Sequence, residues 1–256
     1  MRIALISDVH ANAEALAATL ADIATQAVDR VVCLGDIVGY NTKPGECLAL
    51  IRRHDILCVA GNHDLAVCRR TTTEHFSRAA ARAVAWTRQR LTADDLDVLR
   101  TLPLKVTIGG EVIAVHGALH PETGCASVRL DDDEGRMLSF RALMAHPSGA
   151  RICAFGHTHQ AAVYEFRGGE AVLRRGAEIQ LRDDAYYLIN PGTVGEPRGR
   201  DRRASYTVLD LARRAVTLRH VAYDAAVPFL AACHAGLVPR FGFSSLKQTL
   251  RAVIKA

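Results

Sequence analysis

Five short polar motifs follow apolar runs of the sequence, and most of their side chains are Asp, Asn or His. They are Asp8-Val9-His10, Gly35-Asp36, Gly61-Asn62-His63-Asp64, His116-Gly117 and Gly156-His157-Thr158-His159. Carboxylate oxygens and neutral imidazole nitrogens suit Mn, Fe, Zn, Co or Ni, and the absence of thiolate from the set argues against a structural zinc site. These ligands exceed what one ion needs. The motifs together predict a site for two metal ions.

Any one of these motifs alone is weak evidence. An Asp-Val-His sequence at the end of a strand is more often a turn than a ligand set, and Asn and Asp are common turn formers. The stronger indication is that all five follow predicted core strands. Because sites in α/β sheets lie at the carboxyl ends of strands, motifs spread over residues 8–159 can converge on one crevice.

The chemistry expected of such a site is metal-assisted hydrolysis. Two ions about 3.5–4 Å apart can share a carboxylate and a hydroxide, polarise phosphoryl oxygens and activate water. One Asp is therefore expected to bridge the ions. A metal-bridging hydroxide would attack phosphorus in line, while the ions neutralise charge on the equatorial oxygens.

The elements that must position the first three motifs form a β-α-β-α-β pattern. Strands are predicted in IALIS (3–7), RVVCLGD (30–36) and ILCVAGNHD (56–64), the last ending in a polar loop. Helices are predicted after His10, with Asn12 as N-cap, and over 44–53. This alternation predicts a parallel core sheet with right-handed crossovers.

The rest of the chain is predicted to add helices first and strands later. Helices are expected over 74–90, from the capping signal at Thr92 to about Leu102, from the acidic run 131–134 to about Met144, over 225–235 and over 244–254. Strands are expected within 105–117 around a Gly109-Gly110 turn, within 150–159, and over 162–166, 170–175, 186–192, 205–210 and 215–221.

Composition favours a soluble globular protein. The 256 residues are 49% hydrophobic and 23% charged, which is enough for one domain over 1–256 without disulfide staples. The seven cysteines are scattered and odd in number, so they are expected to be reduced. No apolar run is long enough for a membrane helix, and the N-terminus lacks the hydrophobic region of a signal peptide, which predicts a cytoplasmic protein. A net charge of +5 is compatible with a phosphate-bearing substrate but predicts no stable nucleic-acid binding.

Three further stretches carry a resemblance to a known family. They are GDIVGYNTKP (35–44), the Trp86 helix leading into LRTLPLK (99–105), and NPGTVGEPRGRDRRASYTVLD (190–210). With the five motifs, the sequence resembles the calcineurin-like metallophosphoesterases over nearly its whole length. It is most similar to their compact prokaryotic phosphodiesterase branch, which is grouped with diadenosine tetraphosphate hydrolases. The resemblance implies an α/β fold, a four-layer αββα sandwich of two mixed sheets flanked by helices.

The resemblance also implies a role for each motif. Asp8, His10 and His159 would bind one ion, Asn62, His116 and His157 the other, and Asp36 would bridge them. Mn and Fe are the favoured ions, with Zn, Ni, Co and Mg as alternatives. His63 would assist the leaving group, and Asp64 would orient His63.

The sequence departs from the branch at several places near the expected substrate. The branch usually has Ser at Thr193, Gln at Glu196 and an Asp-Gly pair at Gly199-Arg200. Arg198 fits the pattern and is the candidate phosphate clamp, with a solvated surface Arg as the alternative. Tyr40 and Asn41 either line the pocket or form a turn after the second strand. His75 and His120 follow polar motifs and are weaker candidates for substrate contact.

The expected activity is phosphodiester hydrolysis, with phosphomonoesters as an alternative substrate. Further alternatives are a dinucleoside polyphosphate hydrolase, a protein phosphatase and a non-catalytic metal-binding scaffold. A scaffold typically lacks a metal ligand or the leaving-group histidine, and in this sequence that histidine, His63, is present. Segments of about 70–102 and 118–150 are expected to wall the cleft. The expected partner is a small phosphorylated substrate, for example a nucleotide, and not a membrane. The chain is expected to be a monomer or a homodimer.

Overall fold

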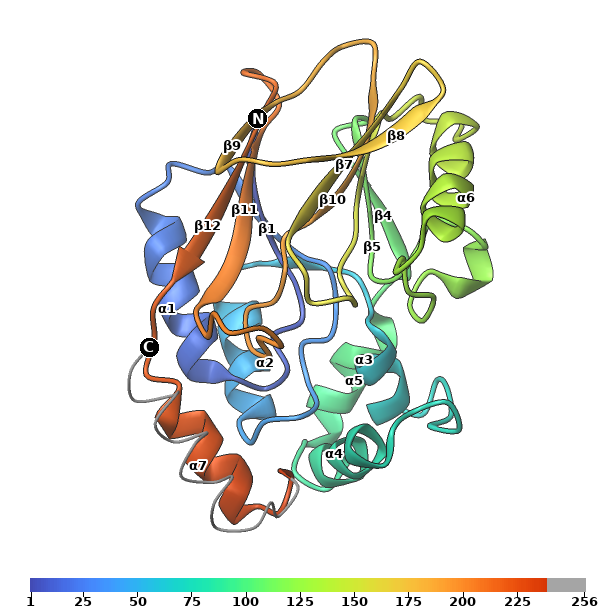
Figure 1. The fold of residues 1–256 in the computed structure, drawn as a ribbon. Coiled ribbons are helices and arrows are strands. Elements are labelled where there is room, and N and C mark those ends of the chain that lie inside the picture. Colours follow the sequence, from blue (N-terminus) through green and yellow to red (C-terminus); the bar gives the residue numbers. More distant parts are fainter. Residues whose placement is uncertain (239–256) are drawn as a thin grey trace.

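Two six-stranded β-sheets form the centre of the computed structural model, which describes residues 1–238 (Figure 1). The first sheet has the order β3-β2-β1-β11-β12-β9 and the second the order β4-β5-β6-β10-β7-β8. The strands of the first sheet are β1 (Arg2–Ile6), β2 (Arg30–Cys33), β3 (Leu57–Cys58), β9 (Glu178–Gln180), β11 (Ala204–Asp210) and β12 (Ala215–Val221). Those of the second are β4 (Lys105–Ile108), β5 (Val112–Val115), β6 (Ile152–Ala154), β7 (Ala162–Arg167), β8 (Glu170–Arg174) and β10 (Tyr186–Asn190).

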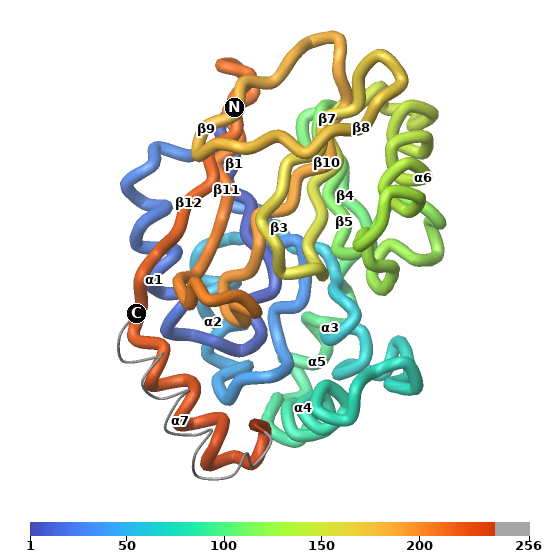
Figure 2. The backbone as a smooth tube through the Cα atoms, viewed as in Figure 1, coloured from blue at the N-terminus to red at the C-terminus, as the bar shows by residue number. Residues whose placement is uncertain are grey.

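Each sheet is mixed in the same way. Strands β1, β2 and β3 are parallel, as are β5, β6 and β10, and antiparallel strands extend both groups. Figure 2 shows β1 and β11 running side by side although about 200 residues separate them; Leu5 pairs with Thr207 there. The predicted parallel core and the mixed αββα sandwich are confirmed.

The core between the sheets consists of aliphatic side chains from both inner faces. Leu5 and Val32 of the first sheet belong to one buried cluster with Ile152 and Ile189 of the second. At about 25 cal/mol per Å² of apolar area, this burial is the main force that joins the sheets. Because the sheets cannot slide apart, the strand ends that carry the polar motifs are fixed relative to one another.

Helices cover the outer faces and one end of the sandwich (Figure 1). Helices α1 and α2 cover the first sheet and α6 covers the second, while α3, α4, α5 and α7 gather at one end. Their bounds are α1 (Ala13–Ala24), α2 (Pro44–Arg53), α3 (Asn62–Val67), α4 (Arg78–Arg88), α5 (Ala93–Thr101), α6 (Asp133–Met144) and α7 (Ala226–His234). The predicted caps are present, since Asn12 Oδ1 accepts from Ala15 N and Thr92 Oγ1 from Asp95 N. No helix within residues 1–238 is long and apolar enough to cross a membrane.

Several predicted boundaries were wrong. The Gly61–Asp64 motif begins α3 instead of forming a loop, because the Asp64 carboxylate accepts from Gly61 N and caps the helix start. Strand β3 has two residues, because Ala60 N donates to Pro103 O outside the sheet. Helix α4 begins only at Arg78.

Two short elements were not predicted, and one predicted helix is not covered. Strand β9 pairs with β12 at the edge of the first sheet, and a 3₁₀ turn forms at Glu122–Gly124. The helix predicted over 244–254 lies outside the described residues.

Candidate metal centre

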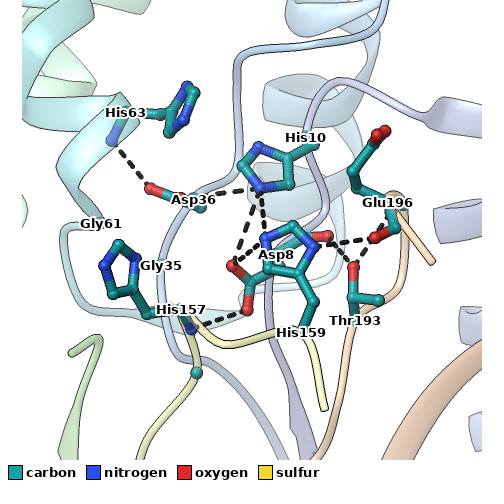
Figure 3. A network of polar contacts seen from close by, with 12 residues as sticks. Asp8, His10, Gly35, Asp36, Gly61, His63, His157, His159, Thr193 and Glu196 are labelled. Atoms are coloured by element: carbon teal, nitrogen blue, oxygen red, sulfur yellow. Dashed lines mark hydrogen bonds and ion pairs between the residues drawn. The ribbon is translucent and has the colours of Figure 1, made fainter. Parts of the chain in front are cut away.

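The five polar motifs meet at one rim of the sandwich. Asp8 follows β1, Asp36 follows β2, His116 follows β5, and His157 and His159 follow β6. Three overlapping groups have ligand atoms within 4.8 Å of one another: Asp8, His10 and His159; His10, Asp36 and His63; and Asp36, His116 and His157. Asn62 joins the third group, since its Oδ1 lies 3.2 Å from His116 Nε2. Figure 3 shows part of this cluster: Asp8, His10, Asp36, His63, His157 and His159.

The backbone at these residues is in an uncommon conformation. The φ angle is 54° at Asp8 and Asp36, 50° at His10, 64° at His157 and 61° at His159. A non-glycine residue in this left-handed region costs about 1–3 kcal/mol and persists only where the surroundings impose it. Such strain is concentrated at functional sites, and here it lies at five residues of the predicted ligand set.

Three histidines are anchored in the same way. The Nδ1 atoms of His10, His116 and His159 lie 3.2, 2.7 and 2.8 Å from the backbone oxygens of Val38, Leu34 and Glu196. Only an Nδ1–H can donate to a carbonyl, so each neutral ring leaves Nε2 with a free lone pair. This arrangement fixes the tautomer and orientation of a metal-binding histidine.

The free lone pairs face one another. His10 Nε2 and His159 Nε2 are 3.1 Å apart, and Asp8 Oδ1 lies 3.1 Å from His159 Nε2. Asp8 Oδ1 is buried without a hydrogen-bond partner in the described part of the chain. Buried acceptors that face one another are costly unless a cation or proton lies between them. The donor set therefore fits a bound cation.

The Asp8 and Asp36 carboxylates are held in the same way. Asp8 Oδ2 accepts from His157 N at 3.0 Å, and Asp36 Oδ1 accepts from His63 N at 2.9 Å. The other oxygen of each residue faces the cluster: Asp36 Oδ2 lies 3.6 Å from His10 Nε2 and 3.3 Å from His116 Nε2. Asp36 thus lies between the two halves of the cluster.

Electrostatics prepares these groups for a cation. Burial raises the pKa of both Asp8 and Asp36, but the charges of neighbouring histidines outweigh it and hold both pKa values well below the usual range. Burial, reinforced by the charge of His116, lowers the pKa of His157 to about 3. For His116, burial is outweighed by Asp36, which raises the pKa to about 9. Ionised carboxylates and neutral imidazoles are the forms that bind metals, so Asp8, Asp36 and His157 are ready for a cation, whereas His116 must release a proton when one binds.

Support for the cluster comes from residues that are not themselves candidate ligands. Thr193 Oγ1 donates to Asp8 O at 2.8 Å. Asn190 Nδ2 donates to Gly156 O at 2.8 Å and to Thr158 Oγ1 at 3.0 Å, and so fixes the loop between His157 and His159. At Gly61, any added Cβ would clash with the Asp36 carboxylate. These contacts leave little freedom for the cluster to change shape.

The expected contact between Asp64 and His63 is absent, and that prediction was wrong. The Asp64 carboxylate accepts from Val38 N at 3.2 Å and Gly61 N at 2.9 Å. Burial and the nearby charge of Asp36 raise the pKa of Asp64 to about 7. Asp64 therefore fixes the backbone that carries His63, but it does not touch the imidazole.

A cleft of about 500 Å³ opens at the cluster. Its lining residues are Asp36, Tyr40, Asn62, His63, His75, Phe76, Ser77, Ala80, Ser127, Arg129, His157, His159, Glu196 and Arg198. Arg198 Nη2 lies 3.2 Å from His159 Nε2, so the candidate clamp is at the cluster. His75 lines the cleft, whereas His120 is not among the lining residues.

Asn41 lies beside this cleft instead of in it. Its Nδ2 donates to His10 O at 3.0 Å and contacts Glu196 Oε2 at 3.4 Å. Asn41 lines a neighbouring hollow of about 420 Å³, which shares Tyr40 and Glu196 with the cleft. Its amide thus supports the loop after β1.

Sequence reasoning missed part of the cleft wall. Phe76 precedes α4, and Arg129 donates to His157 O at 3.1 Å while pairing with Asp131 through two contacts of 2.6 and 3.1 Å. Neither residue belongs to a motif or follows a strand. No sequence signal marks them beyond their place in the predicted wall segments.

Buried carboxylates and histidines at the rim of this αββα sandwich define a class of protein, the metal-dependent phosphoesterases, which are hydrolases. The sequence model of the calcineurin-like phosphoesterase superfamily domain matches residues 1–214. The chain belongs to this superfamily, as its motifs predicted.

Known proteins resemble the chain over most of its length. An uncharacterised protein of Methanocaldococcus jannaschii is 35% identical over 226 residues, which cover 87% of this chain and 88% of the relative. The crystal structure of a metallophosphoesterase from Sphaerobacter thermophilus is similar with a TM-score of 0.77 and 34% identity, covering 99% of both chains. A hypothetical protein from Pyrococcus horikoshii has a TM-score of 0.75 at 16% identity, covering 93% of this chain and 94% of its own, and shows the fold alone.

Proposed function

We propose that the protein hydrolyses phosphodiester bonds with the help of two metal ions. In this proposal Asp8, His10 and His159 hold one ion, Asn62, His116 and His157 hold the other, and Asp36 is shared. The observation that carries it is the position of Asp36 Oδ2, 3.6 and 3.3 Å from the Nε2 atoms of two carbonyl-anchored histidines. A carboxylate oxygen between two such nitrogens is suited to bridging.

Bound cations would polarise a phosphoryl oxygen and lower the pKa of water at the site. The chain's own residues supply the rest. Arg198 lines the cleft beside His159, where a guanidinium can bind phosphate oxygens through two hydrogen bonds and orient the ester. His63 lines the same cleft and would give a proton to the departing oxygen. Burial lowers the pKa of His63 in the free protein, so this proton would be taken up with the anionic ester, whose charge favours the protonated imidazole.

The ligand chemistry limits the ions without selecting one. Imidazole and carboxylate ligands without thiolate accept Mn, Fe, Zn, Co or Ni; among these we propose Mn and Fe, with Zn, Ni, Co and Mg as alternatives. Metal analysis of protein purified without chelator, together with activity after reconstitution with each ion, would decide among them.

The cleft wall supports a diester over a monoester. Glu196 brings a carboxylate to the lining, where the charge of Arg198 acts on it but no ion pair closer than 4.0 Å forms among residues 1–238. A phosphomonoester carries about two negative charges at pH 7 and a diester carries one, so this carboxylate penalises the monoester more. The wall segments 70–102 and 118–150, which supply Phe76 and Arg129, would set the identity of the ester groups.

The test is hydrolysis by the Mn-loaded enzyme. Bis-p-nitrophenyl phosphate should be cleaved with a higher kcat/KM than p-nitrophenyl phosphate. A preference for the monoester would contradict the diesterase proposal, and an inactive protein that still binds two ions would favour a scaffold.

A dinucleoside polyphosphate hydrolase is the second candidate. The hollow beside the cleft favours it, because it is lined by Tyr223 and Phe229 and offers room for a second aromatic group. Turnover of bis-p-nitrophenyl phosphate without turnover of diadenosine tetraphosphate would eliminate this candidate.

A further inference from the structure

We propose that His63 is positioned by the packing of two aromatic rings, those of Tyr40 and Phe76, and not by a hydrogen bond to its imidazole. This inference rests on the proposed function, in which His63 assists the leaving group. It assigns Phe76 as a positioning residue and gives Tyr40 a second role besides lining the cleft.

His63 differs from the anchored histidines of the cluster. His10, His116 and His159 each direct Nδ1 at a backbone oxygen, whereas His63 Nδ1 is buried and has no hydrogen-bond partner within the described chain. The backbone N–H of His63 is fixed by Asp36 Oδ1 at 2.9 Å. The main chain is therefore held, and rotation of the ring is the freedom that remains.

Aromatic neighbours restrict that rotation. The ring centroid of His63 lies 4.7 Å from that of Tyr40, at 44°, and 5.0 Å from that of Phe76, at 48°. The His10 ring lies 4.9 Å away at 77°. Centroid distances of 4.5–7 Å in tilted or edge arrangements are favourable for ring pairs. Three rings thus contact the imidazole, and together they define its plane.

Gly39 explains why no polar side chain lies beside His63 Nδ1. A Cβ added to Gly39 would clash with His63 Nδ1, so only a glycine leaves room for the imidazole here. Its φ of +99° also suits glycine alone. The Nδ1 edge of the His63 ring therefore faces the Gly39 backbone. Packing against the neighbouring rings orients the imidazole, whereas a carboxylate or carbonyl oxygen orients histidines elsewhere.

Phe76 is the part of this arrangement that is separate from the metal cluster. It lies just before Ser77, the N-cap of α4, and its backbone N donates to Thr73 O at 3.0 Å. Tyr40 also contacts His10, with centroids 4.7 Å apart, so changing it affects a candidate ligand. Phe76 is therefore the better position for a test.

The experiment compares two diaryl phosphodiesters that differ in their nitro groups and therefore in the need for a proton. Bis-p-nitrophenyl phosphate releases a stabilised phenolate, while diphenyl phosphate releases a more basic one and depends more on an acid. We expect Phe76→Leu to lower kcat on diphenyl phosphate about 10-fold and on bis-p-nitrophenyl phosphate by less than about twofold, with metal content unchanged and any change in KM shared by both esters. Phe76→Tyr, which keeps the ring, should restore kcat.

His63→Ala separates the two proposals. It should lower kcat on diphenyl phosphate by roughly 10²–10⁴-fold, with a smaller loss on the nitrophenyl ester. Equal losses on both esters would reject the leaving-group role itself. A selective loss in His63→Ala without one in Phe76→Leu would reject ring positioning, as would a Phe76→Leu effect confined to KM, which would mean that Phe76 contacts the substrate.

Matched controls address folding. Phe166→Leu removes a partly buried ring that packs against Phe140 and lines neither the cleft nor the neighbouring hollow, so it should leave the ratio of the two kcat values unchanged. If Phe76→Leu fails to fold, Gly39→Ala tests the same point, because its added methyl group must displace the imidazole. An unchanged kcat ratio in folded Gly39→Ala would overturn the inference.

Discussion

The floor and the wall of the cleft are built on different principles. The floor, formed by Asp8, Asp36 and the histidines that face them, is buried and held by backbone hydrogen bonds at strained φ angles. The wall, formed by Phe76, Arg129, Glu196 and Arg198, comes from loops and is more exposed. The difference teaches that the candidate ligands are fixed by the sheets, whereas the cleft lining comes from segments that can vary without disturbing them, and in the proposed function these segments choose the substrate.

Removal of metal is the severest test of the floor. Chelation should abolish activity and lower the Tm by about 5–10 °C, because a ligand at 100 times its Kd stabilises a protein by about 2.7 kcal/mol and each kcal/mol shifts the Tm of a domain this size by about 2–4 °C. Calorimetry with and without chelator measures the shift. An unchanged Tm would mean that the facing acceptors of His10 and His159 are accommodated without a cation.

Asp36→Asn tests the floor at one atom. Loss of the shared negative charge should reduce metal content from two ions to one or none and activity by about 10³-fold, in line with the several kcal/mol that a metal contributes to charge stabilisation. Elemental analysis gives the metal content. Asp201→Asn, an exposed carboxylate outside the cleft lining, is the matched control and should retain both ions. Two ions in Asp36→Asn would contradict the bridge.

Arg198→Ala tests the wall of the cleft instead of the floor. Loss of a charge-assisted contact to phosphate should lower kcat/KM about 10-fold, or ~1.4 kcal/mol, mainly through KM and without loss of metal. Steady-state kinetics on bis-p-nitrophenyl phosphate measures it. Arg200→Ala removes an exposed arginine two residues away that is not among the lining residues, and it should behave like the wild type. Equal effects in both variants would mean that Arg198 acts only as a surface charge and does not bind the phosphate.

The contrast between floor and wall also explains which parts of the site could be predicted from the sequence. The floor was predictable because its residues directly follow core strands, which the sequence marks as buried apolar runs. The carboxyl ends of such strands lie at the rim of the sheet, so Asp8, Asp36 and His116 could be placed without coordinates. The start of α3 was missed because Asp64 caps a helix where the sequence reads as a turn. Phe76 and Arg129 were missed because their positions depend on loop packing, for which no periodicity exists.

Glu196→Gln is the mildest change and bears on the wall alone. The substitution keeps the shape and the Glu196 backbone oxygen that accepts from His159 Nδ1, so the floor should be undisturbed. Burial raises the pKa of Glu196, which shows that its charge lies in a poorly solvated place where it acts on neighbours with little screening. Removing that charge should raise kcat/KM for p-nitrophenyl phosphate about threefold relative to bis-p-nitrophenyl phosphate, since the dianion gains more than the monoanion. Measured at low and high ionic strength, the change should persist with added salt, because salt screens a poorly solvated charge only weakly. A shift toward the diester would contradict the charge argument, and the wall would then select its substrate by shape and not by charge.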